Sequence, residues 1–226
     1  GIIMGSNSKG TLVMNNTIKN VSESGISSFS QSVSLINNTI SEVFGSGIVI
    51  NGGNSVISGG LINDSEAQGS PSAAILVSSQ NNNISGVEIT NTGAGAVDLY
   101  IGQNGTRLID MPHIGKYNIS NSGVVFENTK YGEIEFLQSI NGFGNNLTND
   151  VRIGNNSVIV ESGINVGLNK SANITLYGLS GFIDPIIKRD GKECRAPLCV
   201  NYTSLSINEV KFGVTSWTNY SIGEIE

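Results

Sequence analysis

The stretch "VSLINNTI" at residues 33–40 is a second version of "TLVMNNTI" at residues 11–18, and both end in Asn-Asn-Thr-Ile. Two asparagines inside an apolar segment are costly if their amide groups are buried without hydrogen-bond partners. Either the segment is a surface loop that occurs twice, or the asparagines bond to one another in a repeating structure.

The repeat extends well beyond these two copies. After a first step of 22 residues, three further segments end in isoleucine at steps of 22, 27 and 25 residues: "ISGGLI" (57–62), "ISGVEI" (84–89) and "IDMPHI" (109–114). A second column places a small residue before a β-branched one: Gly1-Ile2, Gly25-Ile26, Gly47-Ile48, Ala74-Ile75, Ala96-Val97 and Gly123-Val124. Two residues further lie Met4, Ser28, Ile50, Val77, Leu99 and Phe126. Such alternation is typical of half-buried strands, and it predicts one interior row of Ile2, Ile26, Ile48, Ile75 and Val97.

A column of small polar residues predicts a bend in every coil. It reads Asn15, Asn37, Gly59 and Gly86, and then Met111. Asparagine and glycine enter the left-handed backbone region at little cost, so we expect a structural turn row here, with Asn15 and Asn37 facing inward. Stacked asparagines can donate and accept hydrogen bonds along such a row. The neighbouring pair, Asn16 and Asn38, is the alternative source of this ladder.

These columns resemble the right-handed parallel β-helix repeat of pectate-lyase-like enzymes, phage tailspikes, a periplasmic protein of copper-site maturation, and many archaeal and bacterial surface proteins. The resemblance covers about residues 1–145, and "YGEIEFLQSI" (131–140) is a candidate for the last coil. It implies a solenoid, but it does not imply one activity, because this fold carries unrelated functions. Coil five departs from the pattern, with Met111 and Pro112 in place of small bend residues.

The last third of the chain has a different pattern. Val210, Phe212 and Val214 alternate ahead of Trp217 and Tyr220, which indicates antiparallel strands. "ANITLYGL", "KECRAPLCV" and "FGVTSWTNYSIG" resemble a small β-sandwich module that follows β-helix repeats in archaeal surface glycoproteins. We therefore predict an all-β chain, with a right-handed parallel β-helix over 1–146 and an antiparallel β-sandwich-like module over 147–226. The single tryptophan is either part of this module's core or a platform for a sugar, and core is the more frequent role.

Charge argues against one function class, and the cysteine pair favours an exported chain. The 226 residues carry a net charge of −6, with 13% charged residues, which argues against a nucleic-acid surface. No apolar run reaches the ~20 residues of a membrane span. Cys194 and Cys199, five residues apart, are predicted to form a small disulfide loop, since two cysteines without a nearby histidine cannot complete a zinc site.

Thirteen Asn-x-Ser/Thr sequons also favour export and N-linked glycans. Two of them, Asn15 and Asn37, are assigned to the turn row instead. The predicted glycosylation sites are Asn20, Asn63, Asn83, Asn104, Asn118, Asn146, Asn155, Asn169, Asn173, Asn201 and Asn219.

The ionisable residues do not form a recognisable catalytic or metal-binding motif. Acidic residues are scattered over Asp64, Glu66, Glu88, Asp98, Asp110, Glu127, Glu133 and Glu135, and the densest region is coil five, with Asp98, Arg107, Asp110, His113 and Lys116. A glycosidase needs two converging carboxylates, and copper delivery needs clustered Met, His or Cys, whereas Met4, Met14 and Met111 lie apart. Asp64-Ser65-Glu66 matches no calcium loop. We expect no catalytic residue, metal or cofactor.

These patterns together predict an extracellular, structural or adhesive cell-surface glycoprotein. The alternative is a polysaccharide-acting lyase or glycosidase of the pectate-lyase-like fold, and a surface polysaccharide is an expected partner in either case. "GIIM" begins the first coil with Ile2 already in the interior row, so we expect adjoining coils or a neighbouring subunit at the N-terminal end.

Overall fold

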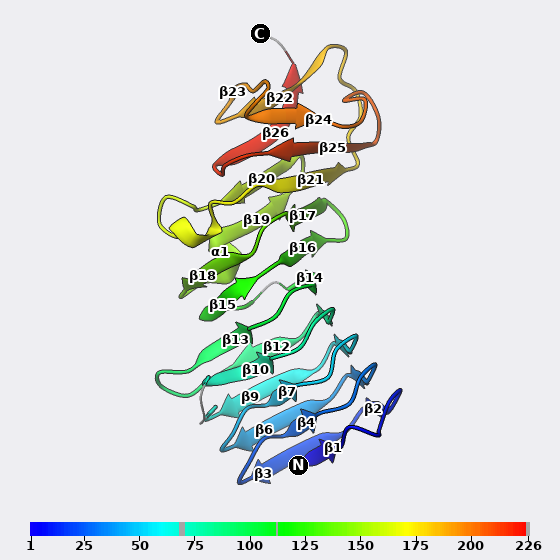
Figure 1. The fold of residues 1–226 in the computed structure, drawn as a ribbon, viewed down its shortest axis with the longest axis vertical. Coiled ribbons are helices and arrows are strands. Elements are labelled where there is room, and N and C mark those ends of the chain that lie inside the picture. The colour runs from blue at the N-terminus through cyan, green and yellow to red at the C-terminus, as the bar shows by residue number, and fades with distance from the viewer. Residues whose placement is uncertain (68–70, 112, 225–226) are drawn as a thin grey trace.

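The computed structural model describes residues 1–67, 71–111 and 113–224, and its coils stack along one long axis (Figure 1). The two termini lie at opposite ends of this axis. The chain is all-β and forms a β-solenoid of about 6 turns, followed by an antiparallel sheet. The predicted fold class is confirmed: the solenoid is a parallel β-helix.

Three sheets form the walls of the solenoid, because each of the first four coils contributes one short strand to each wall. Sheet A contains β1 (Ile2–Met4), β4 (Ile26–Ser28), β7 (Ile48–Ile50), β10 (Ala73–Val77), β13 (Val97–Ile101), β15 (Tyr117–Ser122) and β18 (Ile140–Gly144). Sheet B begins with β2 (Leu12–Met14), β5 (Ser34–Ile36), β8 (Val56–Ser58), β11 (Asn83–Ser85), β14 (Thr106–Ile109) and β16 (Val124–Asn128). Sheet C contains β3 (Thr17–Val21), β6 (Thr39–Val43), β9 (Leu61–Ser65) and β12 (Glu88–Thr90).

The interior row predicted for sheet A is present over the first four coils. Ile2 pairs with Ile26, Ile26 with Ile48, and Ile48 with Ile75. The assignment of the fifth position to Val97 is wrong.

Residue Leu99 takes that fifth position, because it pairs with Ile75, whereas Val97 pairs with Ala73. Val124 and Phe126 lie in sheet B, opposite Thr106 and Leu108, and so do not continue the sheet A columns.

The isoleucine column that ends each repeat lies in sheet C. Ile18, Ile40, Ile62 and Ile89 stack in register, and all four are buried. Ile114 is also buried, at 1% exposure, but it lies outside any strand. Sheet C therefore ends two coils earlier than the parallel parts of sheets A and B.

The turn row adopts left-handed backbone angles. Asn15, Asn37, Gly59 and Gly86 have φ values of 56°, 51°, 62° and 57°. In the fifth coil Asp110, with φ of 46°, takes the place that we assigned to Met111. Pro112, the other residue that we expected in place of a small bend residue, lies outside the described residues.

The second asparagine of each pair makes the ladder. The Nδ2 of Asn38 donates to the carbonyl oxygen of Val13 at 2.9 Å, and its Oδ1 accepts from both the backbone N and the Nδ2 of Asn16 at 3.1 Å. Asn38 is 5% exposed, whereas Asn15 and Asn37 are exposed. The inward-facing assignment of Asn15 and Asn37 is therefore wrong, because a left-handed residue at this corner places its own side chain outside and the next one inside.

Parallel pairing ends at β16. The next strand, β17 (Gly132–Phe136), pairs with β16 antiparallel, and β18 pairs with β15 in the same way. "YGEIEFLQSI" is therefore a hairpin return and not a last coil. Sheet B then continues through β21 (Ala172–Tyr177), β25 (Glu209–Val214) and β24 (Cys199–Asn201) without a break.

The C-terminal region places a second antiparallel sheet against the end of sheet B. Sheet D contains β19 (Val151–Gly154), β20 (Ser157–Val160), β26 (Asn219–Glu224), β22 (Pro185–Arg189) and β23 (Lys192–Glu193). The short helices are α1 (Leu147–Asp150) and the 3₁₀ turn η1 (Val166–Leu168). The Phe212 ring of sheet B lies 6.4 Å from the Tyr220 ring of sheet D, so the two sheets share a core. Trp217, at 2% exposure, belongs to that core.

Candidate functional site on the outer face of sheet B

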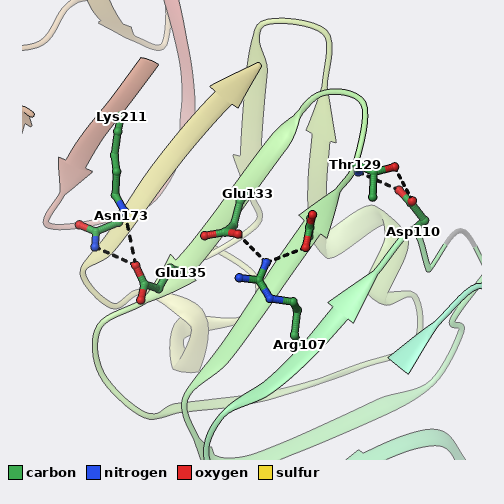
Figure 2. A network of polar contacts seen from close by, with 8 residues as sticks. Arg107, Asp110, Thr129, Glu133, Glu135, Asn173 and Lys211 are labelled. Atoms are coloured by element: carbon green, nitrogen blue, oxygen red, sulfur yellow. Dashed lines mark hydrogen bonds and ion pairs between the residues drawn. The ribbon is translucent and has the colours of Figure 1, made fainter. Parts of the chain in front are cut away.

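Charged side chains gather on the outer face of sheet B where its pairing changes from parallel to antiparallel (Figure 2). Glu127 of β16 and Glu133 of β17 lie directly opposite each other. The Nη1 of Arg107, from β14, donates to Glu127 Oε2 at 2.6 Å and to Glu133 Oε2 at 2.5 Å. One guanidinium thus bridges two carboxylates from two other strands. We call these three residues the Arg107 cluster.

A second polar group lies on the next two strands of the same face. The Nδ2 of Asn173 donates to Glu135 Oε2 at 2.9 Å, and the Nζ of Lys211 lies 4.0 Å from the same oxygen (Figure 2). Beside the cluster, Asp110 accepts hydrogen bonds from the backbone N of Thr129 at 3.0 Å and from its Oγ1 at 2.6 Å. The outer face therefore carries separate polar groups between β14 and β25.

The electrostatics of the cluster stabilise the charged form of Arg107 between the two glutamates. Partial burial opposes the charge of the Arg107 guanidinium, but hydrogen bonds and charges from Glu133 and Glu127 outweigh it and raise the pKa of Arg107. Burial, followed by the charges of Glu133, Glu127 and Glu209, raises the pKa of nearby Tyr177. Tyr177 therefore stays protonated at neutral pH, and the two carboxylates are matched by one permanent cation.

Glycosidase catalysis requires two carboxylates on one face, and the cluster provides them. However, Arg107 occupies the space between the two carboxylates. Over 1–67, 71–111 and 113–224, no group of three or more His, Cys, Asp or Glu side chains lies close enough to hold a metal ion. Within the same ranges, no helix is long and apolar enough to cross a membrane.

The structure separates the coil-five residues that are close in sequence. Asp98 accepts hydrogen bonds from Thr92 Oγ1 at 2.7 Å and from the backbone N of Gly115 at 2.8 Å. His113 and Lys116 are exposed, and Arg107 turns toward the two glutamates instead. The description of the acidic residues as scattered is therefore wrong for Glu127 and Glu133. They flank the turn "NTKYG" symmetrically, and recognising a hairpin there would have placed them opposite each other.

The remaining predicted sites are the cysteine pair and the Asp64-Ser65-Glu66 segment. Cys194 and Cys199 form a disulfide, with Cα atoms 5.7 Å apart. Asp64 and Glu66 are exposed on either side of Ser65, whose Oγ donates to the carbonyl oxygen of Gly45 at 2.9 Å.

Most predicted glycosylation sites lie on the surface. The exposed ones are Asn20, Asn83, Asn104, Asn146, Asn155, Asn169, Asn201 and Asn219, and the half-buried ones are Asn63, Asn118 and Asn173. The Nδ2 of Asn173, the atom that a glycan would modify, already donates to Glu135. Asn15 and Asn37 are exposed as well, so burial does not separate them from the other sequons.

We expect Arg107→Gln to destabilise the fold at neutral pH by on the order of 1–2 kcal/mol, since it leaves two carboxylates side by side on a partly exposed face. The loss comes from like-charge repulsion on a partly exposed face, so it should shrink at high salt, which screens such charges.

Urea unfolding of this variant at low and high salt measures the effect. The double variant Arg107→Gln/Glu133→Gln is the control and should recover most of the loss. If Arg107→Gln matches the wild type at neutral pH in both low and high salt, the cluster contributes nothing to stability.

Comparison with known proteins gives no match: no protein-family model, no curated protein and no solved structure is significantly similar to this chain. The fold alone therefore defines the class of protein: a parallel β-helix with an antiparallel C-terminal region.

Proposed function

We propose that this chain is part of an extracellular, structural or adhesive cell-surface glycoprotein, of the archaeal type that its sequence resembles. The solenoid acts as a stiff rod that displays glycans and holds its C-terminal region away from the N-terminal end. The observation that carries the proposal is the combination of a disulfide with exposed sequons along a rod. Disulfides persist in oxidising compartments, and sequons are modified on the export route.

Secretion of the chain from a cell that performs N-glycosylation tests this proposal. We expect an intact mass above the 23.7 kDa of the polypeptide, shifted down by enzymatic glycan removal, and no free thiol. A secreted protein with the bare polypeptide mass would contradict it.

The N-terminal end offers a surface for adjoining coils. The strands β1, β2 and β3 are the first in their sheets, and each pairs with one neighbour among the described residues. Ile3, Leu12 and Met14 are 67%, 53% and 47% exposed at this end. We propose that another β-helical coil, from the same or a second chain, pairs with these strand edges.

The variant Ile3→Glu should therefore lower self-association of the chain in sedimentation velocity at least severalfold, because it places a charge on the apolar end. Glu88→Gln, on an outer strand of sheet C, is the control and should sediment like the wild type. A wild-type chain that stays monomeric at high concentration would contradict the pairing of this end with a second copy.

One observation favours a second candidate, a polysaccharide-acting enzyme. Glu127 and Glu133 lie opposite each other on the outer face of sheet B, and their charges reach Tyr177. An assay of neutral and acidic polysaccharides for new reducing ends or unsaturated products tests it, with Glu133→Gln as the inactive control. Turnover that this variant abolishes would support the enzyme and displace the structural role.

A further inference from the structure

A shallow hollow of about 700 Å³ lies where the outer face of sheet A meets the loop before η1. Its lining includes two sequon asparagines, Asn118 and Asn146, and two apolar side chains, Phe143 and Ile164. Phe143 is 75% exposed and Ile164 is 84% exposed. Apolar side chains of this size that are exposed together, and not singly, often mark a contact site.

The register of the sheet places the aromatic ring beside one of the sequons. Asn118 of β15 pairs directly with Phe143 of the antiparallel strand β18. Directly opposite residues in an antiparallel pair project from the same face, with Cβ atoms about 5 Å apart. The neighbouring residues Tyr117 and Ile119 are buried at 1%, so Asn118 and Phe143 both face outward.

Side-chain hydrogen bonds below the hollow hold the backbone that carries this ring. The Nδ2 of Asn165 donates to the carbonyl oxygen of Phe143 at 2.7 Å and to the Oη of Tyr117 at 2.7 Å. The Oη of Tyr117 in turn donates to Asp150 Oδ2 at 2.6 Å. Phe143 is thus held by its backbone while its ring stays in solvent.

We propose that Asn118 carries an N-linked glycan whose first sugar packs on the Phe143 ring within this hollow. The inference rests on the proposed function, since it needs an exported chain. In the modification, Asn118 Nδ2 forms a bond to the anomeric carbon of a lipid-pyrophosphate-linked oligosaccharide. The bond from that carbon to the phosphate oxygen breaks, the lipid pyrophosphate leaves, and the amide nitrogen loses one proton. The apolar C–H face of the sugar then covers the ring and removes its surface from water.

The chain contains a matched comparison site. Asn83 is also a sequon on the outer face of a strand, but its cross-strand neighbours are Val56 and Arg107, and neither is aromatic. A glycan at Asn83 therefore has no aromatic ring directly opposite it on a neighbouring strand. Phe29, which is 54% exposed, is the control for removing an exposed phenylalanine elsewhere.

The test uses the full chain, secreted from cells whose N-glycans begin with N-acetylglucosamine and trimmed to that first sugar by an endoglycosidase. We expect the sugar at Asn118 to raise the folding equilibrium constant about fivefold relative to Asn118→Gln, and this gain to vanish in Phe143→Ala. The sugar at Asn83 should give no gain that depends on Phe143, and Phe29→Ala should leave the Asn118 gain unchanged. In NMR spectra, ring-current shifts of the Asn118 sugar protons should disappear in Phe143→Ala.

The outcomes separate the inference from the proposed function. Two outcomes overturn the inference alone. In the first, Asn104 or Asn83 carries a glycan but Asn118 does not. In the second, Asn118 carries a glycan, but the gain in stability that it gives survives in Phe143→Ala. A chain without glycans at any sequon overturns the proposed function and the inference together.

Discussion

Ile48→Asp is expected to unfold the coils cooperatively. Ile48 is 3% exposed and sits between Ile26 and Ile75 in the interior row of sheet A. A carboxylate at this position has no partner and cannot reach water, so the folded state should lose on the order of 4 kcal/mol or more. That loss is comparable with the whole stability of many domains. Circular dichroism during urea unfolding measures it, and we expect the midpoint to collapse.

The neighbouring position supplies the control. Val49 lies on the same strand, but its side chain is half-buried on the outer face, so Val49→Asp should cost much less than Ile48→Asp. Equal losses at the two positions would mean that the strand has no inner and outer face, and the register in sheet A would be wrong.

Trp217→Ala should produce the second-largest loss, about 3–5 kcal/mol, because it leaves a large cavity between sheets B and D. The Trp217 ring lies 5.6 Å from the Phe136 ring and 5.9 Å from the Tyr220 ring, and its Nε1 donates to the carbonyl oxygen of Lys170 at 2.7 Å. Thermal unfolding followed by calorimetry measures the effect.

Two further variants separate packing from the hydrogen bond. Trp217→Phe keeps most of the ring contact and should lose about 1–3 kcal/mol, for the unpaired carbonyl and the smaller ring. Tyr202→Ala, at a 54% exposed aromatic, should change stability by less than about 1 kcal/mol. A Trp217→Ala loss no larger than that of Tyr202→Ala would contradict the shared core.

Sequence periodicity located the solenoid correctly but lost its register in the fifth coil. The first coils share a 22-residue spacing, so Ile26 and Ile48 align without ambiguity. In the fifth coil β13 is two residues longer than β7, and both Val97 and Leu99 have the parity of inward residues. Because side chains alternate with a period of two, a two-residue shift leaves the hydrophobic pattern almost unchanged. Pattern alone therefore could not choose Leu99.

The spacing of residues along the sequence did not predict the Arg107 cluster. Arg107 meets Glu127 because parallel strands from successive coils are adjacent, and it meets Glu133 because the chain then reverses in a hairpin. With residues 131–140 as a candidate last coil, nothing in the sequence pattern placed Glu133 opposite Glu127. The Asn118–Phe143 pair was missed for the same reason, since β18 also runs antiparallel to its neighbour.

Protease shaving of intact cells that make this protein, followed by glycopeptide mass spectrometry, tests the proposed role most directly. We expect peptides from exposed loops to be released without cell lysis, and those that contain Asn104 and Asn169 to carry glycans. Peptides that appear only after lysis, and that are unmodified at every sequon, would contradict an extracellular glycoprotein rod.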